Sequence, residues 1–222
     1  MLAQLVLRRA ALAAICPPAP VGGVWPTLAQ DRVFDSRLDG YDKFSSEEPR
    51  IAIVIYTEEM RSQPGSTING QPHTPTVQLI VQVTARQLVD VDNDLSLDMP
   101  SSDPLLEAAI DTTCSQILHR LMVKPRAAFY LARSRVVDQS SEPYRESEGG
   151  SPIAARAIIL SCQMPRDYGS PAWARKVAAL LPDGDDGRQI IEAAAAALEA
   201  TMALDTQTPL TGVDITEVTP IG

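Results

Sequence analysis

The stretch Pro49-Arg50-Ile51-Ala52-Ile53-Val54-Ile55-Tyr56 decides the fold of this 222-residue chain. Successive side chains of a strand point to opposite faces, so the three isoleucines fall on one face, while Val54 and Tyr56 make the other face apolar too. β-branched and aromatic residues favour strands, and a strand with two apolar faces is buried inside a sheet. We therefore expect a central strand here, with helices covering at least one face of the sheet.

A second strand is predicted at residues 76–84, where apolar Val77, Leu79, Val81 and Val83 alternate with polar residues. This alternation is typical of a strand with one solvated face. The segment between the two strands, Glu58 to Pro75, is rich in Gly, Pro, Ser and Thr. Hairpin connections usually have roughly two to five residues, and much longer ones are commonly functional. The segment therefore predicts a functional hairpin loop.

Other patterns place helices and strands around this hairpin. Residues 2–16 have apolar positions near helical spacing and end at Pro17-Pro18, which predicts an amphipathic core helix. Residues 32–36 predict a short strand at the sheet edge. The clearest amphipathic helix spans 104–122, with Asp103 as its N-cap and a proline in its first position. Residues 151–164 predict a third long strand.

The C-terminal part of the chain has a different character. Residues 127–137 suggest part helix and part strand, and 139–150 suggest a loop. Two alanine-rich helices are expected at 171–181 and 188–204, separated by an acidic turn in which Asp186 caps the second helix. We expect residues 1–166 to form an α/β domain with its own core. Residues 167–222 would be a mostly helical extension, packed on a neighbouring subunit or an outer rim and removable without loss of the fold.

Composition excludes several function classes. The net charge is −9, whereas a nucleic-acid-binding surface needs clustered Lys and Arg. No apolar stretch has the length of a membrane span. Cys16, Cys114 and Cys162 are odd in number and widely spaced, which is typical of buried free thiols in a reducing compartment. We therefore expect a soluble intracellular protein that does not bind a membrane.

The acidic segment Asp90-x-Asp92-x-Asp94 resembles the start of a calcium loop, which places carboxylates at alternate positions. Leu95 stands where the sharp turn needs glycine, and Ser101 stands where a bidentate glutamate belongs. We expect a solvated acidic loop and no bound metal. The alternative, a small metal-dependent hydrolase using the Asp90–Asp98 cluster, would be recognised by calcium binding.

Catalytic motifs are scarce elsewhere in the sequence. His119 follows Cys114 by five residues on one predicted helix, which does not place two zinc ligands on one face. Nucleophile elbows, phosphate loops and dinucleotide fingerprints are not found. With two histidines, the chain is poor in general bases. We expect neither a cofactor nor an enzymatic activity.

A family resemblance rests on the order of these segments. A short helix precedes Val33-Phe34-Asp35-Ser36-Arg37, the strand Pro49 to Tyr56 follows, and a long hairpin leads to Leu79-Ile80-Val81-Gln82-Val83. An amphipathic helix and a strand at 155–162 come next. This order resembles the tail terminator, or tail completion, proteins of long-tailed bacteriophages and related gene-transfer agents. The resemblance covers roughly residues 1–166; the 139–150 insert and the region after Asp167 depart from it.

The resemblance implies an α/β (α+β) fold, a mainly antiparallel sheet with helices on one face, and six copies in a ring. Such a ring caps the tail tube, ends its polymerisation and joins the tail to the head connector or neck protein. The genome would pass through its lumen without specific binding. The hairpin would dock on the tube, with Glu58, Glu59, Arg61, Asn69 and His73 as candidate contacts. A neck or head-completion protein is the nearest alternative, and a host adaptor binding a peptide strand at its sheet edge is another.

Overall fold

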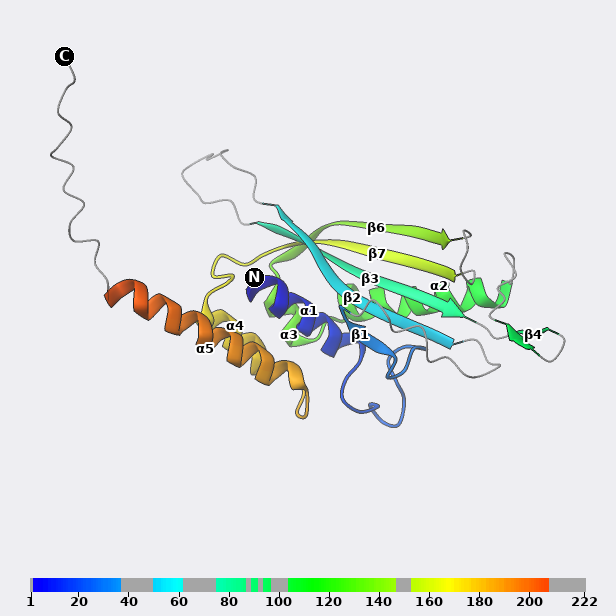
Figure 1. Ribbon diagram of the computed structural model, residues 1–222, viewed down its shortest axis with the longest axis horizontal. Helices are drawn as coiled ribbons and strands as arrows, with labels where there is room; N and C mark the ends of the chain where they lie inside the picture. The colour runs from blue at the N-terminus through cyan, green and yellow to red at the C-terminus, as the bar shows by residue number, and fades with distance from the viewer. Residues whose placement is uncertain are drawn as a thin grey trace, which may run out of the picture.

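The computed structural model describes residues 2–36, 50–61, 75–86, 89–91, 94–96, 104–146 and 153–207. Within these residues the chain forms a five-stranded mixed sheet with helices packed on one face (Figure 1). A separate two-stranded ribbon consists of β4 (Val89–Val91) and β5 (Asp94–Ser96). The expected α+β fold, with helices on one face of a mainly antiparallel sheet, is confirmed.

The sheet has the strand order β1-β2-β3-β7-β6. The predicted central strand is β2 (Arg50–Arg61), and it pairs antiparallel with β3 (Thr76–Arg86) as expected. On its other side β1 (Val33–Asp35) runs parallel to it and covers only Ile53 to Ile55. β7 (Ile153–Gln163) and β6 (Arg135–Glu146) complete the sheet with antiparallel pairings. The innermost strand is therefore β3.

One face of the sheet forms the main core. Ile55, Val81 and Ile158 lie in register across β2, β3 and β7, and all three are buried. They pack in one cluster with apolar residues of α1 (Leu2–Ile15) and α2 (Pro104–Leu118), such as Leu7 and Ile117. The opposite face carries Gln78, Gln82 and Ser161 between buried residues. This pattern explains the alternation that predicted β3.

Helix α1 lies in the middle of the molecule. It contacts β1, β2 and β3 on one side and α3 (Ala127–Ala132), α4 (Pro171–Ala178) and α5 (Asp186–Gln207) on the other (Figure 1). Its buried positions include five alanines, at positions 3, 10, 11, 13 and 14. Small side chains let neighbouring elements approach the helix closely. The expected amphipathic helix is therefore covered on both sides, by the sheet and by α3, α4 and α5.

The C-terminal helices share this core. Trp173 on α4 is 1 % exposed, and its indole N–H donates a hydrogen bond to the Leu131 carbonyl oxygen (3.2 Å). Ile191 and Ala195 on α5 are also fully buried. The expectation that this helix packs on a neighbouring subunit or an outer rim is thus wrong for these residues, since α1 and α4 cover them. The limits of the domain, predicted at residues 166 and 167, remain a prediction.

Two local predictions need correction. The loop predicted from residue 139 is a strand up to Glu146, because β7 supplies a hydrogen-bonding partner that a polar edge sequence does not reveal. The cap of α5 is Asp185, whose Oδ1 accepts a hydrogen bond from the Gly187 N–H (2.7 Å). Asp186, the predicted cap, forms an ion pair with Arg9 instead (3.2 Å).

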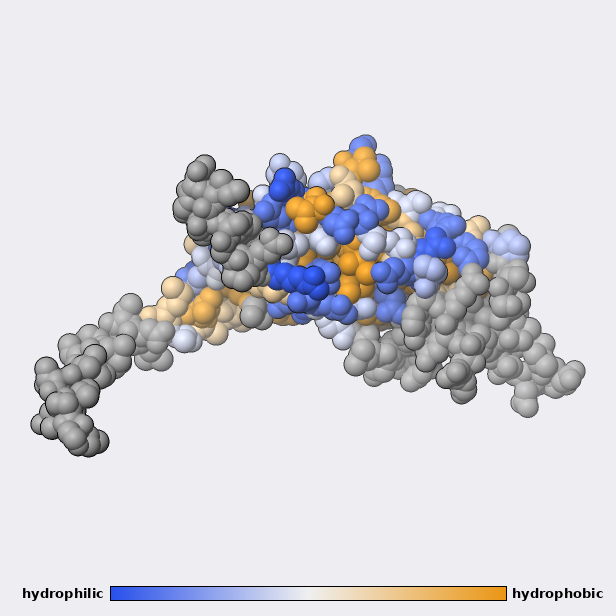
Figure 2. Space-filling view, turned by 90° about the horizontal axis from the view of Figure 1, so that it is seen from above, coloured by the Kyte–Doolittle hydropathy of each residue, from blue (hydrophilic) through white to orange (hydrophobic). Residues whose placement is uncertain are grey.

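β6 is a long edge strand with a mostly polar surface. The view onto this side shows mainly hydrophilic residues with smaller hydrophobic areas between them (Figure 2). The β6–β7 register shifts between Val136 and Asp138, and the strand carries Pro143. Bulges, charges and proline discourage an edge strand from pairing with another chain. These features argue against the adaptor alternative, in which a peptide adds to the sheet edge.

Replacing Trp173 by alanine is predicted to lower the free energy of unfolding by about 3–5 kcal/mol, since it leaves a large cavity where α4 meets α1 and α3. Urea denaturation measures the change. Tyr130→Ala is the matched control, because Tyr130 lies on α3 with 66 % of its surface exposed. Equal, small effects of the two substitutions would contradict the placement of α4 in the core.

Candidate functional site

The predicted docking residues lie at the end of the β2–β3 hairpin. Glu58, Glu59 and Arg61 belong to β2, which continues to the pair Arg61–Thr76. The loop was predicted to begin at Glu58, and this is corrected, because β2 continues to Arg61. The end of this strand was not predicted, because its last residues are mostly charged and the β2–β3 register shifts between Thr57 and Met60. Asn69 and His73 lie outside the described residues.

The register shift at Glu58 and Glu59 is held in place from the helical layer. The side-chain amide of Gln4, on α1, donates a hydrogen bond to the Glu58 carbonyl oxygen (2.7 Å). Irregularities of this kind redirect side chains and are common next to functional sites. Both glutamates are exposed, and Glu59 pairs with Arg61 (2.7 Å). An exposed pair contributes at most about 1 kcal/mol, so these charges are available to a partner.

The acidic segment does not form a metal site within the described residues. Asp90 and Asp94 belong to paired strands, where the backbone of Asp90 is opposite Leu95 and that of Val91 is opposite Asp94. Asp92 and Asp98 lie outside the described part. Among the residues that the structure describes, no three His, Cys, Asp or Glu side chains converge as metal ligands would. The hydrolase alternative gains no support from this geometry.

The three cysteines are free and poorly reactive. Cys114 and Cys162 are buried, and Cys16 is partly buried. Burial raises the pKa of Cys16 and of Cys114 to about 11, and that of Cys162 to about 12. Nucleophilic attack needs the thiolate, which is scarce at neutral pH when the pKa is this high. The thiols therefore behave as small apolar side chains.

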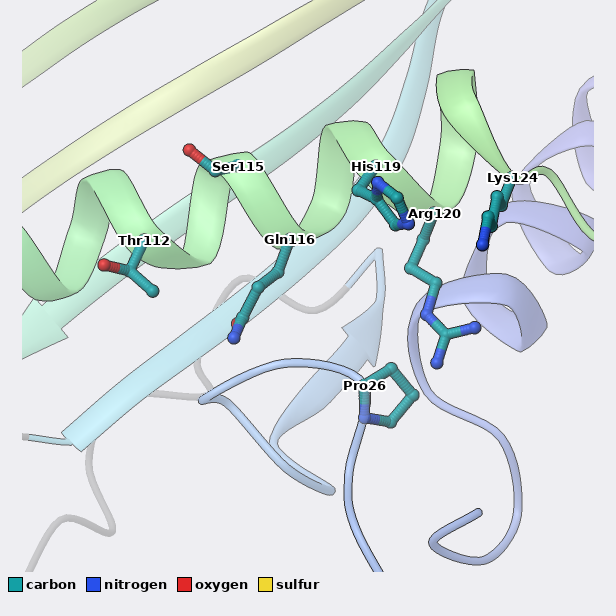
Figure 3. Close-up of a pocket in the computed structure, with 7 residues that line it drawn as sticks. All are labelled: Pro26, Thr112, Ser115, Gln116, His119, Arg120 and Lys124. Atoms are coloured by element: carbon teal, nitrogen blue, oxygen red, sulfur yellow. The ribbon is translucent and has the colours of Figure 1, made fainter. Parts of the chain in front are cut away.

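An open groove of about 580 Å³ lies between the end of α2 and the segment around Pro26 (Figure 3). Here α2 continues into a π-helical turn, η2 (His119–Val123), and the Lys124 N–H donates to the His119 carbonyl oxygen (2.8 Å). Gln116 fixes the facing segment, because its Oε1 accepts a hydrogen bond from the Leu28 N–H (2.9 Å). The groove is lined by Pro26, Thr112, Ser115, Gln116, His119, Arg120 and Lys124.

The groove has a basic character in an otherwise acidic protein. Arg120 and Lys124 extend from η2 and its C-terminal end toward the Pro26 side (Figure 3). Burial lowers the pKa of Arg126, and the positive charge of Arg120 lowers it further. Arg120 and Arg126 are therefore near neighbours of like charge. His119 thus belongs to a basic groove and not to a site shared with Cys114.

Sequence reasoning did not single out this groove. The signal was present as three cations at positions 120, 124 and 126 in a chain of net charge −9. The Pro26 side could not be paired with them from the sequence, since 88 positions separate Leu28 from Gln116 and only the tertiary fold brings the two together.

The comparisons leave the family open. No protein-family model matches this chain, and no curated protein matches its sequence. None of the helices in the described ranges is long and apolar enough to cross a membrane.

The raised thiol pKa values predict a loss of stability in alkaline solution. Unfolded thiols ionise near pH 9, whereas the native ones stay protonated to about pH 11 or 12. The unfolded state therefore binds fewer protons than the native state in this window, and the free energy of unfolding falls as pH rises from about 9 to 11. Below about pH 9 the thiols are protonated in both states, so they do not make the free energy of unfolding depend on pH.

Urea denaturation at pH 7, 8 and 10 measures this effect. Tyrosine and lysine also titrate at high pH, so the triple variant C16A/C114A/C162A serves as the control. It should be less stable at pH 7 and should lose less stability between pH 8 and 10 than the unsubstituted protein. Identical pH slopes of the two proteins would contradict the burial of the thiols.

Proposed function

We propose that the protein is a ring-forming structural subunit of a bacteriophage tail, which caps the tail tube and ends its polymerisation. In this role six copies form a closed ring that joins the tail to the head connector or neck protein. The subunit is assembled in the host cytoplasm and then belongs to the virion. It acts without a cofactor and without catalysis.

The observation that carries this proposal is the order in which the elements build the sheet. The resemblance rests on a helix, a Phe-Asp segment, a central strand, a long hairpin, an amphipathic helix and a returning strand. These correspond to α1, β1, β2, β3, α2 and β7. They are joined in one sheet with the helices on one face, the arrangement that the resemblance implies.

Two further features fit a ring around DNA. A net charge of −9 repels phosphates, which favours free passage of the genome through a lumen. A closed ring also needs two different complementary surfaces on each subunit. The hairpin end, the basic groove and the polar β6 edge differ in charge and shape, so the subunit offers unlike surfaces.

Electron microscopy of the purified protein tests the proposal. Negatively stained particles should be six-fold rings with a central hole, and light scattering should give about six times the 23.9 kDa mass of one chain. Monomers across the micromolar range, with no ring in the presence of tail tubes, would contradict it.

The hairpin loop is the proposed contact with the tube. Replacing residues 62–74 by Gly-Asn-Gly-Ser keeps the Arg61–Thr76 pair and the hydrogen bond from the Met164 N–H to the Pro75 carbonyl oxygen (2.9 Å). The resulting loop has a length common in hairpins, so the fold should persist. Tubes assembled with this variant should overgrow. A variant in which the order of residues 62–74 is scrambled serves as the control, since it keeps the length and composition of the loop. Tubes of normal length with the shortened loop would exclude a docking role.

A further inference from the structure

We propose that the groove between η2 and the Pro26 segment is a subunit contact, in which Arg120 and Lys124, with Arg126 near Arg120, receive an acidic surface of a second copy of this chain. The inference rests on the proposed ring and names one of the two surfaces that such a ring needs.

The first argument is the lack of charge compensation at this groove. Arg120, Lys124 and Arg126 form no ion pair with any carboxylate in the described part of the chain. Elsewhere, arginine–carboxylate ion pairs within the chain are the common arrangement, as at Arg8, Arg9, Arg61, Arg156, Arg175 and Arg188. The described residues that line the groove include Arg120 and Lys124 but no carboxylate, and Arg126 is close enough to Arg120 that its pKa, lowered mainly by burial, is lowered further by repulsion from the charge of Arg120. An anionic partner would remove this repulsion on binding.

Exposed apolar residues surround the groove. Val123 is 66 % exposed beside Lys124, and Leu28, which is 45 % exposed, is hydrogen-bonded through its backbone to Gln116 of the groove. A small free anion needs no apolar surface, whereas protein interfaces combine apolar residues with arginine. π-helical turns are also frequent at functional sites. The occupant is therefore part of a protein.

The charge of the chain indicates that the occupant is another copy. A chain with net charge −9 carries the complementary charge on its own surface. One acidic corner is formed by Asp31 and by Asp183, Asp185 and Asp186 before and at the start of α5; Asp31 and Asp185 both act on the Cys16 thiol and raise its pKa. Asp31 is exposed, and the Asp183 side chain is fully exposed, with Oδ1 3.4 Å from Arg188 Nη2 in an ion pair at the surface. Basic groove and acidic corner differ, as the two sides of a head-to-tail ring contact must.

The test compares two charge reversals of equal size. Lys124→Glu places a negative charge in the groove, whereas Lys176→Glu makes the same change on α4, at another exposed lysine. Light scattering and electron microscopy follow the fraction of rings against concentration. A like charge placed in the contact should raise the concentration for half-assembly by at least about tenfold for K124E. K176E should assemble as the unsubstituted protein does.

A mixing experiment tests the acidic side of the contact. Asp183→Lys should impair assembly when it is alone, as K124E does. Equimolar K124E and D183K should regain rings, because alternating copies in an even-membered ring restore an opposite-charge contact at every groove with a reversed charge. Circular dichroism confirms that each variant is folded. Failure of the folded mixture to assemble would overturn the pairing of groove and corner.

The remaining outcomes separate this inference from the proposed function. Normal rings of K124E would overturn the inference and leave the ring proposal standing, whereas a monomeric unsubstituted protein would overturn both. A fluorescent 20-base-pair DNA duplex serves as the probe for another occupant. Binding of the duplex to the unsubstituted protein and to K176E, but not to K124E, would show a nucleic-acid groove and overturn the inference.

Discussion

The burial of α1 on both of its sides is the constraint on which the rest of the structure depends. The sheet face that carries the main core needs a covering layer, and α1 with α2 provides it. Yet α1 is itself apolar around most of its circumference, so it needs a second layer. α3, α4 and α5 supply that layer, and the alanines of α1 let them pack closely. Sheet, central helix and C-terminal helices therefore form one core.

Two arginines on this central helix impose a second requirement. Arg8 and Arg9 are largely shielded from solvent, and a buried cation is costly unless it is paired. Asp35, the acidic residue of the Phe-Asp segment, pairs with both; its Oδ2 lies 3.0 Å from Arg9 Nε. Arg9 also reaches Asp186 at the start of α5. One ionic network thus joins α1, β1 and α5, which explains why the short strand β1 ends in an aspartate.

Much of the fold could be predicted from the sequence, and the exceptions have a common origin. Periodic apolar patterns located α1, β2, β3, α2 and β7, because their buried faces repeat at helical or strand spacing. β6 was missed since it is an exposed edge strand, whose polar residues carry no such repeat. The C-terminal helices were predicted, but their periodic apolar positions do not show which surface covers these residues. The groove was missed for the same reason: its walls come from segments that only tertiary packing brings together.

The described part of the chain has one core, which the C-terminal helices complete. Expression of residues 1–167 tests it most directly, with solubility and the cooperativity of thermal unfolding as the measurements. Removing α4 and α5 uncovers one side of α1 and deletes the buried Trp173, so we expect a fragment that aggregates or unfolds without cooperativity. A soluble fragment with a sharp unfolding transition would contradict the single core. It would support the predicted division into a domain of residues 1–166 and an extension of residues 167–222.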